Sequence, residues 1–89
     1  MLLPDETRDD ALKRLRRIEG QVAGIARMIE SERPCADVVT QISAASRALD
    51  QVGFKLLATG MRYCAADEQA AADAGYRAEE IEKLFLKLA

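Results

Sequence analysis

Apolar residues recur at alternating steps of four and three over the first third of the chain. This spacing places them on one face of an α-helix, in the seam of a helix hairpin or coiled coil. Pro34 disfavours helical geometry in the residue before it, so the helix should end just ahead of it. We therefore predict a helix over about residues 9–32, preceded by a flexible lead over residues 1–8. The apolar face comprises Ala11, Leu15, Ile18, Val22, Ile25 and Ile29.

The same alternation resumes after Pro34 and predicts a second helix over about residues 35–64. Proline is well suited to the start of a helix, where its missing N–H is not needed. Gly53 and Gly60 fall inside this helix, where each costs roughly 1 kcal/mol relative to alanine. Close packing of another helix would account for Gly53. The apolar face comprises Val38, Ile42, Ala45, Leu49, Val52 and Leu56.

The last quarter of the chain is rich in alanine and acidic residues as far as Gly75 and then becomes apolar at helical spacing. It predicts a linker or a loosely held helical turn over residues 65–77. A third helix over about residues 78–88 follows, too short to be stable unless it docks on the others or on a neighbour. Because no stretch alternates like a strand, the fold class is all-α, with a three-helix protomer.

The composition indicates burial between chains. An 89-residue chain forms one domain, residues 1–89, and is small enough for a monomeric core to be marginal. Hydrophobic residues make up 49% of it, yet aromatic residues make up only 4%. Long amphipathic helices with small apolar side chains therefore favour at least a dimer.

The two cysteines, Cys35 and Cys64, mark the ends of the second predicted helix. They are 29 residues apart, which is a rise of about 43 Å and almost a whole number of turns. A disulfide needs Cα atoms about 5.5 Å apart, so the two cannot pair within one helix. Two antiparallel copies, however, would bring Cys35 of one beside Cys64 of the other, twice.

The positions of these thiols also suggest different roles. A helix N-terminus stabilises a thiolate and a C-terminus disfavours one, so Cys35 would be the attacking thiol and Cys64 the resolving thiol. The alternative is that both are small buried apolar residues. The chain shows neither a signal peptide nor a membrane-spanning run, so a soluble cytoplasmic protein is expected. In that compartment paired thiols more often bind metals or sense redox state.

Charge gives a weaker indication. The net charge is −2, but Lys13, Arg14, Arg16 and Arg17 form a basic run. Such a run is usually a solvated helix face, although a symmetric oligomer would multiply its contacts with phosphates. The chain has no histidine, no glycine-rich phosphate loop and no paired carboxylates in a plausible pocket, so we do not expect an enzyme.

The strings RLRRIEGQVAGIARMIE and PCADVVTQISAASRALD, with the second cysteine 29 residues after the first, resemble the all-helical repressors of the copper-sensing CsoR type. The similarity is strongest from Leu12 to Cys64 and weaker in the last helix. It implies an antiparallel homodimer that assembles into a dimer-of-dimers homotetramer and binds operator DNA without a helix-turn-helix. It also implies a sensing site between protomers, built from the first cysteine of one and the second of the other.

The chain departs from this family at informative places. The copper sensors hold Cu(I) with two cysteines and a histidine four residues before the second, and that position is Gly60 here. The residue before Cys35, often tyrosine in the copper sensors, is Pro34, and a glutamate of their outer shell aligns with Glu80. Two thiols without the imidazole are the pattern of the family's persulfide-sensing CstR branch.

The resemblance also implies DNA contacts. Arg14 and Gln21 would contact DNA, with Arg16 and Arg17 as supporting residues. A second DNA-binding arginine of the copper family aligns with Gln51, and Arg47 one turn earlier is a candidate substitute.

Together these features predict a DNA-binding transcriptional repressor that senses sulfane-sulfur donors. Intersubunit di- or polysulfide bridges between Cys35 and Cys64 would release the operator, without any cofactor. The alternative is a Cu(I)-responsive repressor whose site holds only the two cysteines. A third class is a helical module that carries sulfur on its thiols and does not bind DNA.

Overall fold

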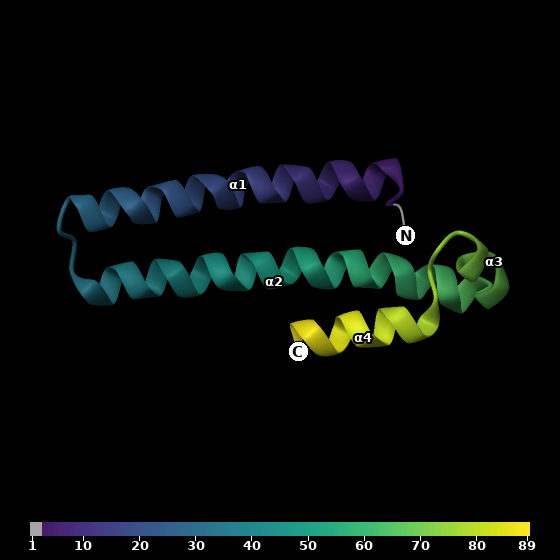
Figure 1. The fold of residues 1–89 in the computed structure, drawn as a ribbon. Coiled ribbons are helices and arrows are strands. Elements are labelled where there is room, and N and C mark those ends of the chain that lie inside the picture. The colour runs from purple at the N-terminus through teal and green to yellow at the C-terminus, as the bar shows by residue number, and fades with distance from the viewer. Residues whose placement is uncertain (1–2) are drawn as a thin grey trace.

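Four helices make up the fold in the computed structural model, which describes residues 3–89. Helix α1 (Asp5–Glu30) and helix α2 (Cys35–Ala66) form a long antiparallel hairpin. The short α3 (Glu68–Asp73) caps the far end of α2, and α4 (Ala78–Leu88) runs back along α2 (Figure 1). The prediction of an all-α fold is confirmed. None of the described helices is long and apolar enough to cross a membrane.

Helix α1 begins earlier than the sequence predicted. The Pro4 carbonyl accepts the first helical hydrogen bond from the Arg8 N–H, and Asp5 and Glu6 lie in the first turn, where the helix dipole favours acidic side chains. The prediction of a flexible lead is therefore wrong for residues 5–8. Its first two residues, Met1 and Leu2, lie outside the described part of the chain.

A tight connection joins α1 to α2. Helix α1 ends at Glu30, and the N–H groups of Ser31, Glu32 and Arg33 each bond back to carbonyls of its last turn. Glu32 takes a left-handed conformation, with φ of 58°, which closes the turn. Pro34 then precedes the first residue of α2, Cys35, so the thiol lies at the helix N-terminus.

The hairpin is held by a narrow seam of small apolar residues. Ala11 and Ile18 of α1 are buried against Val52 of α2, with Leu15 and Leu56 partly buried beside them. These five residues belong to the predicted apolar faces, so the periodicity is confirmed for this part of the hairpin. It is wrong about burial for four other members of those faces, which are exposed: Val22, Ile29, Ile42 and Leu49.

Helix α4 covers one side of the C-terminal half of α2. The two glycines of α2 permit this approach, since a Cβ on Gly53 would lie 2.8 Å from Leu88 Cδ1. The predicted linker is ordered: α2 continues to Ala66, Asp67 caps α3 by accepting a hydrogen bond from the Ala70 N–H, and Gly75 turns the chain with φ of 89°. The six-residue α3 is thus an addition to the predicted helices.

The protomer is a flat slab with two small buried apolar clusters in the described residues and no large central core. It measures 54 × 25 × 14 Å, and its radius of gyration is 16.8 Å, whereas a compact chain of this length would have about 12 Å. No large side chain of the described residues is fully buried. Large apolar side chains remain exposed on α2, among them Val39, Ile42 and Leu49.

Candidate thiol site and nucleic-acid interface

The two thiols lie at opposite ends of one unbroken helix. Cys35 is the first residue of α2 and is exposed, whereas Cys64 lies near its C-terminus and is half-buried. Both are free, as expected for thiols separated by a helical rise of about 43 Å. The structure therefore does not bring the predicted pair together within one protomer.

Cys64 is anchored to the corner between α3 and α4. Its Sγ donates a hydrogen bond to the Tyr76 carbonyl oxygen at 3.3 Å. The Tyr76 ring stacks on Tyr63 with centroids 4.8 Å apart, and burial raises the pKa of the Tyr76 phenol. The thiol also packs against a small cluster that contains Leu57 and Ile81. Loss of the Cys64 proton would remove the hydrogen bond to this corner.

An open apolar hollow of about 400 Å³ lies beside Cys64, between α2 and α4. Glu80, the residue that aligns with an outer-shell glutamate, does not line it and is exposed in the first turn of α4. Glu82, which is one helical turn after Ala78 on α4, lines the hollow instead. The lining residues are Met61, Cys64, Ala78, Ile81, Glu82 and Phe85.

The space beside Gly60, one turn before Cys64 on α2, is occupied by side chains from α4 and the turn that precedes it. A Cβ at this residue would lie 2.7 Å from Ile81 Cδ1 and 3.2 Å from Tyr76 Cδ1. Both distances are shorter than ordinary van der Waals contact, so α4 occupies the space that a larger side chain would need. A histidine at residue 60 would therefore require α4 to pack differently on α2.

The donor set decides which metals could bind. The chain has no histidine, and the described residues contain no group of three or more histidine, cysteine or acidic side chains that could hold a metal ion. The remaining soft donors are thiols, which suit Cu(I) and other soft ions. Cys35 and Cys64 fit such an ion only if they come from two protomers.

The predicted DNA contacts divide into two groups on α1. At 3.6 residues per turn, Arg14, Arg17 and Gln21 form one stripe, while Arg16 points about 160° away from Arg14. Arg17 and Gln21 are exposed and Arg14 is partly covered. Arg14, Arg17 and Gln21 can therefore meet one surface together, and Arg16 cannot join them.

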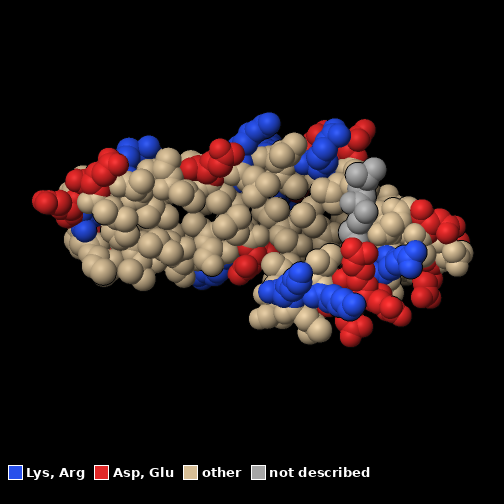
Figure 2. All heavy atoms as spheres, viewed as in Figure 1, with Lys and Arg blue, Asp and Glu red and all other residues tan. Residues whose placement is uncertain are grey.

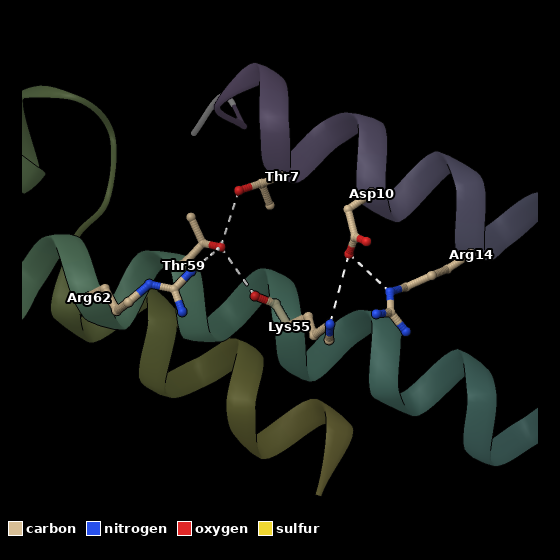
Figure 3. Close-up of polar contacts among 6 residues, drawn as sticks. All are labelled: Thr7, Asp10, Arg14, Lys55, Thr59 and Arg62. Carbon is tan, nitrogen blue, oxygen red and sulfur yellow. Dashed lines mark hydrogen bonds and ion pairs between the residues drawn. The ribbon is translucent and has the colours of Figure 1, made fainter.

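Two residues that sequence reasoning missed adjoin this stripe. Asp10 Oδ2 accepts a hydrogen bond from Arg14 Nε at 2.9 Å and lies 4.0 Å from Lys55 Nζ of α2 (Figure 3). The Arg14 hydrogen bond lowers the pKa of the Asp10 carboxyl, with smaller contributions from the charges of Arg14 and Lys55. The i,i+4 spacing of Asp10 and Arg14 was visible in the sequence, but the partnership with Lys55 was not.

A second polar contact between α1 and α2 lies about one helical turn from Asp10, toward the N-terminus of α1. The Thr7 and Thr59 hydroxyls are 3.5 Å apart, and the buried Thr59 hydroxyl also bonds the Lys55 carbonyl at 3.2 Å (Figure 3). Arg62 Nη2 donates to the same hydroxyl at 3.3 Å. These bonds fix the open end of the hairpin next to Asp10.

Charge and apolar surface are segregated in the space-filling view. Basic and acidic side chains alternate along the α1 edge, while a broad uncharged area covers much of the hairpin away from α4 (Figure 2). Helical spacing places Cys35, Val39, Ile42 and Leu49 on one exposed face of α2. This face is continuous with the end of the helix that carries Cys35.

Comparison with known proteins gives consistent matches. A family model described as "Metal-sensitive transcriptional repressor" matches residues 7–87. The copper-sensing transcriptional repressor CsoR of Bacillus subtilis is 39% identical over 80 residues, which are 90% of this chain and 79% of that protein. The copper-sensing transcriptional repressor RicR of Mycobacterium tuberculosis is 52% identical over 59 residues, which are 66% of this chain but only 62% of RicR.

A solved structure shares the fold. The crystal structure of the copper-sensing repressor CsoR with Cu(I) from Geobacillus thermodenitrificans superposes with a TM-score of 0.72 at 38% identity. The match covers 96% of this chain and 85% of that one.

Proposed function

The chain belongs to the family of metal-sensitive transcriptional repressors, and from this premise we propose that it binds operator DNA and releases it when Cu(I) binds Cys35 and Cys64. Because the family consists of transcriptional repressors, the prediction that the chain is not an enzyme is confirmed. The observation that carries the copper assignment is the pair of free thiols, Cys35 and Cys64, because thiolates are soft donors that suit Cu(I). The names of the relatives and the Cu(I) in the related structure support it.

We assign the assembly as an antiparallel homodimer that pairs into a homotetramer of single-domain chains. The exposed face with Val39, Ile42 and Leu49 supports this, because a slab 14 Å thick leaves that face unburied. Antiparallel packing through it would carry Cys35 of one protomer toward the hollow beside Cys64 of its partner. Each dimer would then hold two equivalent thiol pairs.

The operator-binding surface in this proposal combines stripes from two helices. On α1 it contains Arg14, Arg17 and Gln21. On α2 it contains Lys55, which shares the Asp10 carboxylate with Arg14. Arg47 lies about two turns earlier on α2 and about 80° around the helix from Lys55, at the margin of this surface. Arg16 is left out, and we expect its role in DNA binding to be small.

Operator binding with and without Cu(I) tests the proposal. The wild-type protein should bind a fragment of its own promoter and release it with stoichiometric Cu(I), whereas Cys35→Ala and Cys64→Ala variants should bind DNA and ignore Cu(I). A mixture of these two variants should recover part of the response, because a mixed dimer keeps one intact pair. Failure of Cu(I) to release the wild-type protein, or lack of recovery in the mixture, would refute the shared site.

The arginines give the matched comparison for DNA binding. Arg14→Ala and Arg17→Ala should weaken operator binding and reduce its dependence on salt, since each removed phosphate contact lowers the slope of log K against log salt by about 0.9. Arg16→Ala should behave like the wild type. Equal losses of operator affinity in all three variants would mean that DNA binding depends on the overall positive charge of α1 and not on one stripe of residues.

A second candidate function is sensing of sulfane sulfur, and Gly60 is the observation that favours it. Two thiols suffice for this chemistry. The Cys35 thiolate would take the outer sulfur of a persulfide RSSH, giving a Cys35 persulfide and a thiolate RS⁻. The Cys64 thiolate of the partner would then attack Sγ of Cys35, so that the bond from this atom to the outer sulfur breaks, the intersubunit disulfide forms and HS⁻ leaves. Longer sulfur chains would give polysulfide bridges.

Mass spectrometry under non-reducing conditions separates the two candidates. A persulfide donor should produce a covalent dimer joined through Cys35 and Cys64 and release DNA without copper, if sulfur sensing is correct. If the donor leaves operator binding unchanged while Cu(I) abolishes it, the copper function stands alone.

A further inference from the structure

The hollow beside Cys64 contains a second sulfur atom, in the side chain of Met61. Resting on the Cu(I) function proposed above, we propose that the Met61 thioether is the third donor to the metal. Cys64 and Met61 would come from one protomer and Cys35 from its partner. The site would then be built from three sulfur atoms.

The geometry of α2 supports this placement. Met61 and Cys64 are three residues apart on a continuous helix, a spacing that makes two side chains neighbours on the helix surface. Both line the same open hollow of about 400 Å³. Met61 is 55% exposed, so its flexible side chain has room to swing toward a metal held by Cys64.

The other residues around Cys64 are poorer donors for Cu(I). Gly60 offers no side chain, and its space is filled by Ile81 and Tyr76. Glu82 is the one ionisable oxygen donor among the lining residues of the hollow, but carboxylates suit hard ions, whereas thioethers and thiolates suit Cu(I). Metal binding would displace the Cys64 proton to solvent and end its hydrogen bond to the Tyr76 carbonyl.

A simpler role for Met61 is an apolar contact between protomers. Leucine distinguishes the two roles, because it is close to methionine in volume and lacks the sulfur. Met61→Leu should therefore keep the assembly intact and remove only the donor. Met28→Leu is the matched control, because Met28 lies in the last turn of α1, next to the connection to Cys35, and does not line the hollow beside Cys64. Glu82→Gln tests the carboxylate.

The experiment is a competition for Cu(I) against a coloured Cu(I) chelator, with the tetrameric protein. Met61→Leu should lower the affinity for Cu(I) by more than about 10-fold, since even outer-shell changes at metal sites cost about 10- to 100-fold. Met28→Leu and Glu82→Gln should match the wild type, and sedimentation should show one assembly for all four proteins. If Met61→Leu binds Cu(I) as tightly as the wild type, the third-donor proposal is wrong while the copper function stands.

X-ray absorption gives a direct signature. In a Met28→Leu protein labelled with selenomethionine, the remaining internal selenium is at residue 61, so a copper–selenium scattering shell should appear on Cu(I) loading. Its absence would refute the proposal even if the affinity falls. A wild-type protein that binds no Cu(I) at all would overturn this proposal together with the copper function.

Discussion

Adding one methyl group at Gly60 tests the contact that shapes the thiol site. In the Gly60→Ala variant the new Cβ would meet Ile81 Cδ1 at 2.7 Å and Tyr76 Cδ1 at 3.2 Å. Overpacking of this kind costs about 1–3 kcal/mol, while alanine gains about 1 kcal/mol over glycine inside a helix. We expect a net loss of about 0–2 kcal/mol in the free energy of unfolding.

Gly20→Ala provides the control. Gly20 lies within α1, and a Cβ there would meet nothing within 4 Å, so only the helix propensity changes. This variant should be more stable than the wild type by about 1 kcal/mol. Urea unfolding followed by circular dichroism measures both variants, at one protein concentration because the assembly contributes to stability.

The double variant identifies the atom responsible. Ile81→Val removes the Cδ1 methyl and should cost about 0.5–1.5 kcal/mol by itself. With that methyl gone, Gly60→Ala should become neutral or stabilising, giving a coupling energy of about 1–2 kcal/mol between the two sites. If Gly60→Ala stabilises the wild type as much as Gly20→Ala does, α4 does not pack on this part of α2. A histidine at residue 60 needs the same space, so Gly60→His should also displace α4.

Three further outcomes follow from particular residues. Glu32→Gly should raise the stability by about 0.5–1 kcal/mol in urea unfolding, because glycine adopts the left-handed φ of 58° without strain; a loss of stability would refute that reading of the turn. The Arg14 hydrogen bond lowers the pKa of the Asp10 carboxyl in the folded state, so the ionised carboxylate contributes to the free energy of unfolding in full above its ordinary pKa of 3.8, and this contribution is lost as pH falls. The stability of Asp10→Asn, measured by urea unfolding, should therefore depend less on acid than that of the wild type. Equal acid sensitivity of the two proteins would argue against the Arg14 bond. Burial raises the pKa of the Tyr76 phenol, and in Tyr63→Phe this is the one tyrosine left in the chain. It should ionise above pH 10 in an ultraviolet titration, and the folded state should lose stability as pH rises through that pKa. Ionisation at or below pH 10 would contradict the burial.

Much of the fold could be predicted because helical periodicity is a local property. Steps of four and three predicted that Ala11, Ile18 and Val52 would lie on apolar faces, and these residues meet in the hairpin. The pattern did not show that Ile42 and Leu49 of the same face would stay exposed. The same periodicity placed Cys35 and Cys64 at opposite ends of one helix, which already excluded a bond between them in one chain. Residues 5–10 contain no apolar side chain, so the periodicity carries no sign that α1 begins directly after Pro4.

The stripe proposed to contact DNA was only partly visible in the sequence. A run of four basic residues does not say which of them share a face with a second helix. The structure separates Arg16 from Arg14 and adds Lys55, because Asp10 joins α1 to α2 at that point.

By itself, the sequence determined the three longer helices in outline, the separation of the thiols and the absence of any imidazole donor. Only the tertiary structure decided what surrounds Cys64, because that depends on the direction in which the chain turns at Gly75 and on the face of α4 that meets α2. These contacts join residues that are far apart in the sequence, and local periodicity carries no information about them. Ile81 and Tyr76 consequently fill the place beside Gly60, while Met61 and Cys64 share an open hollow.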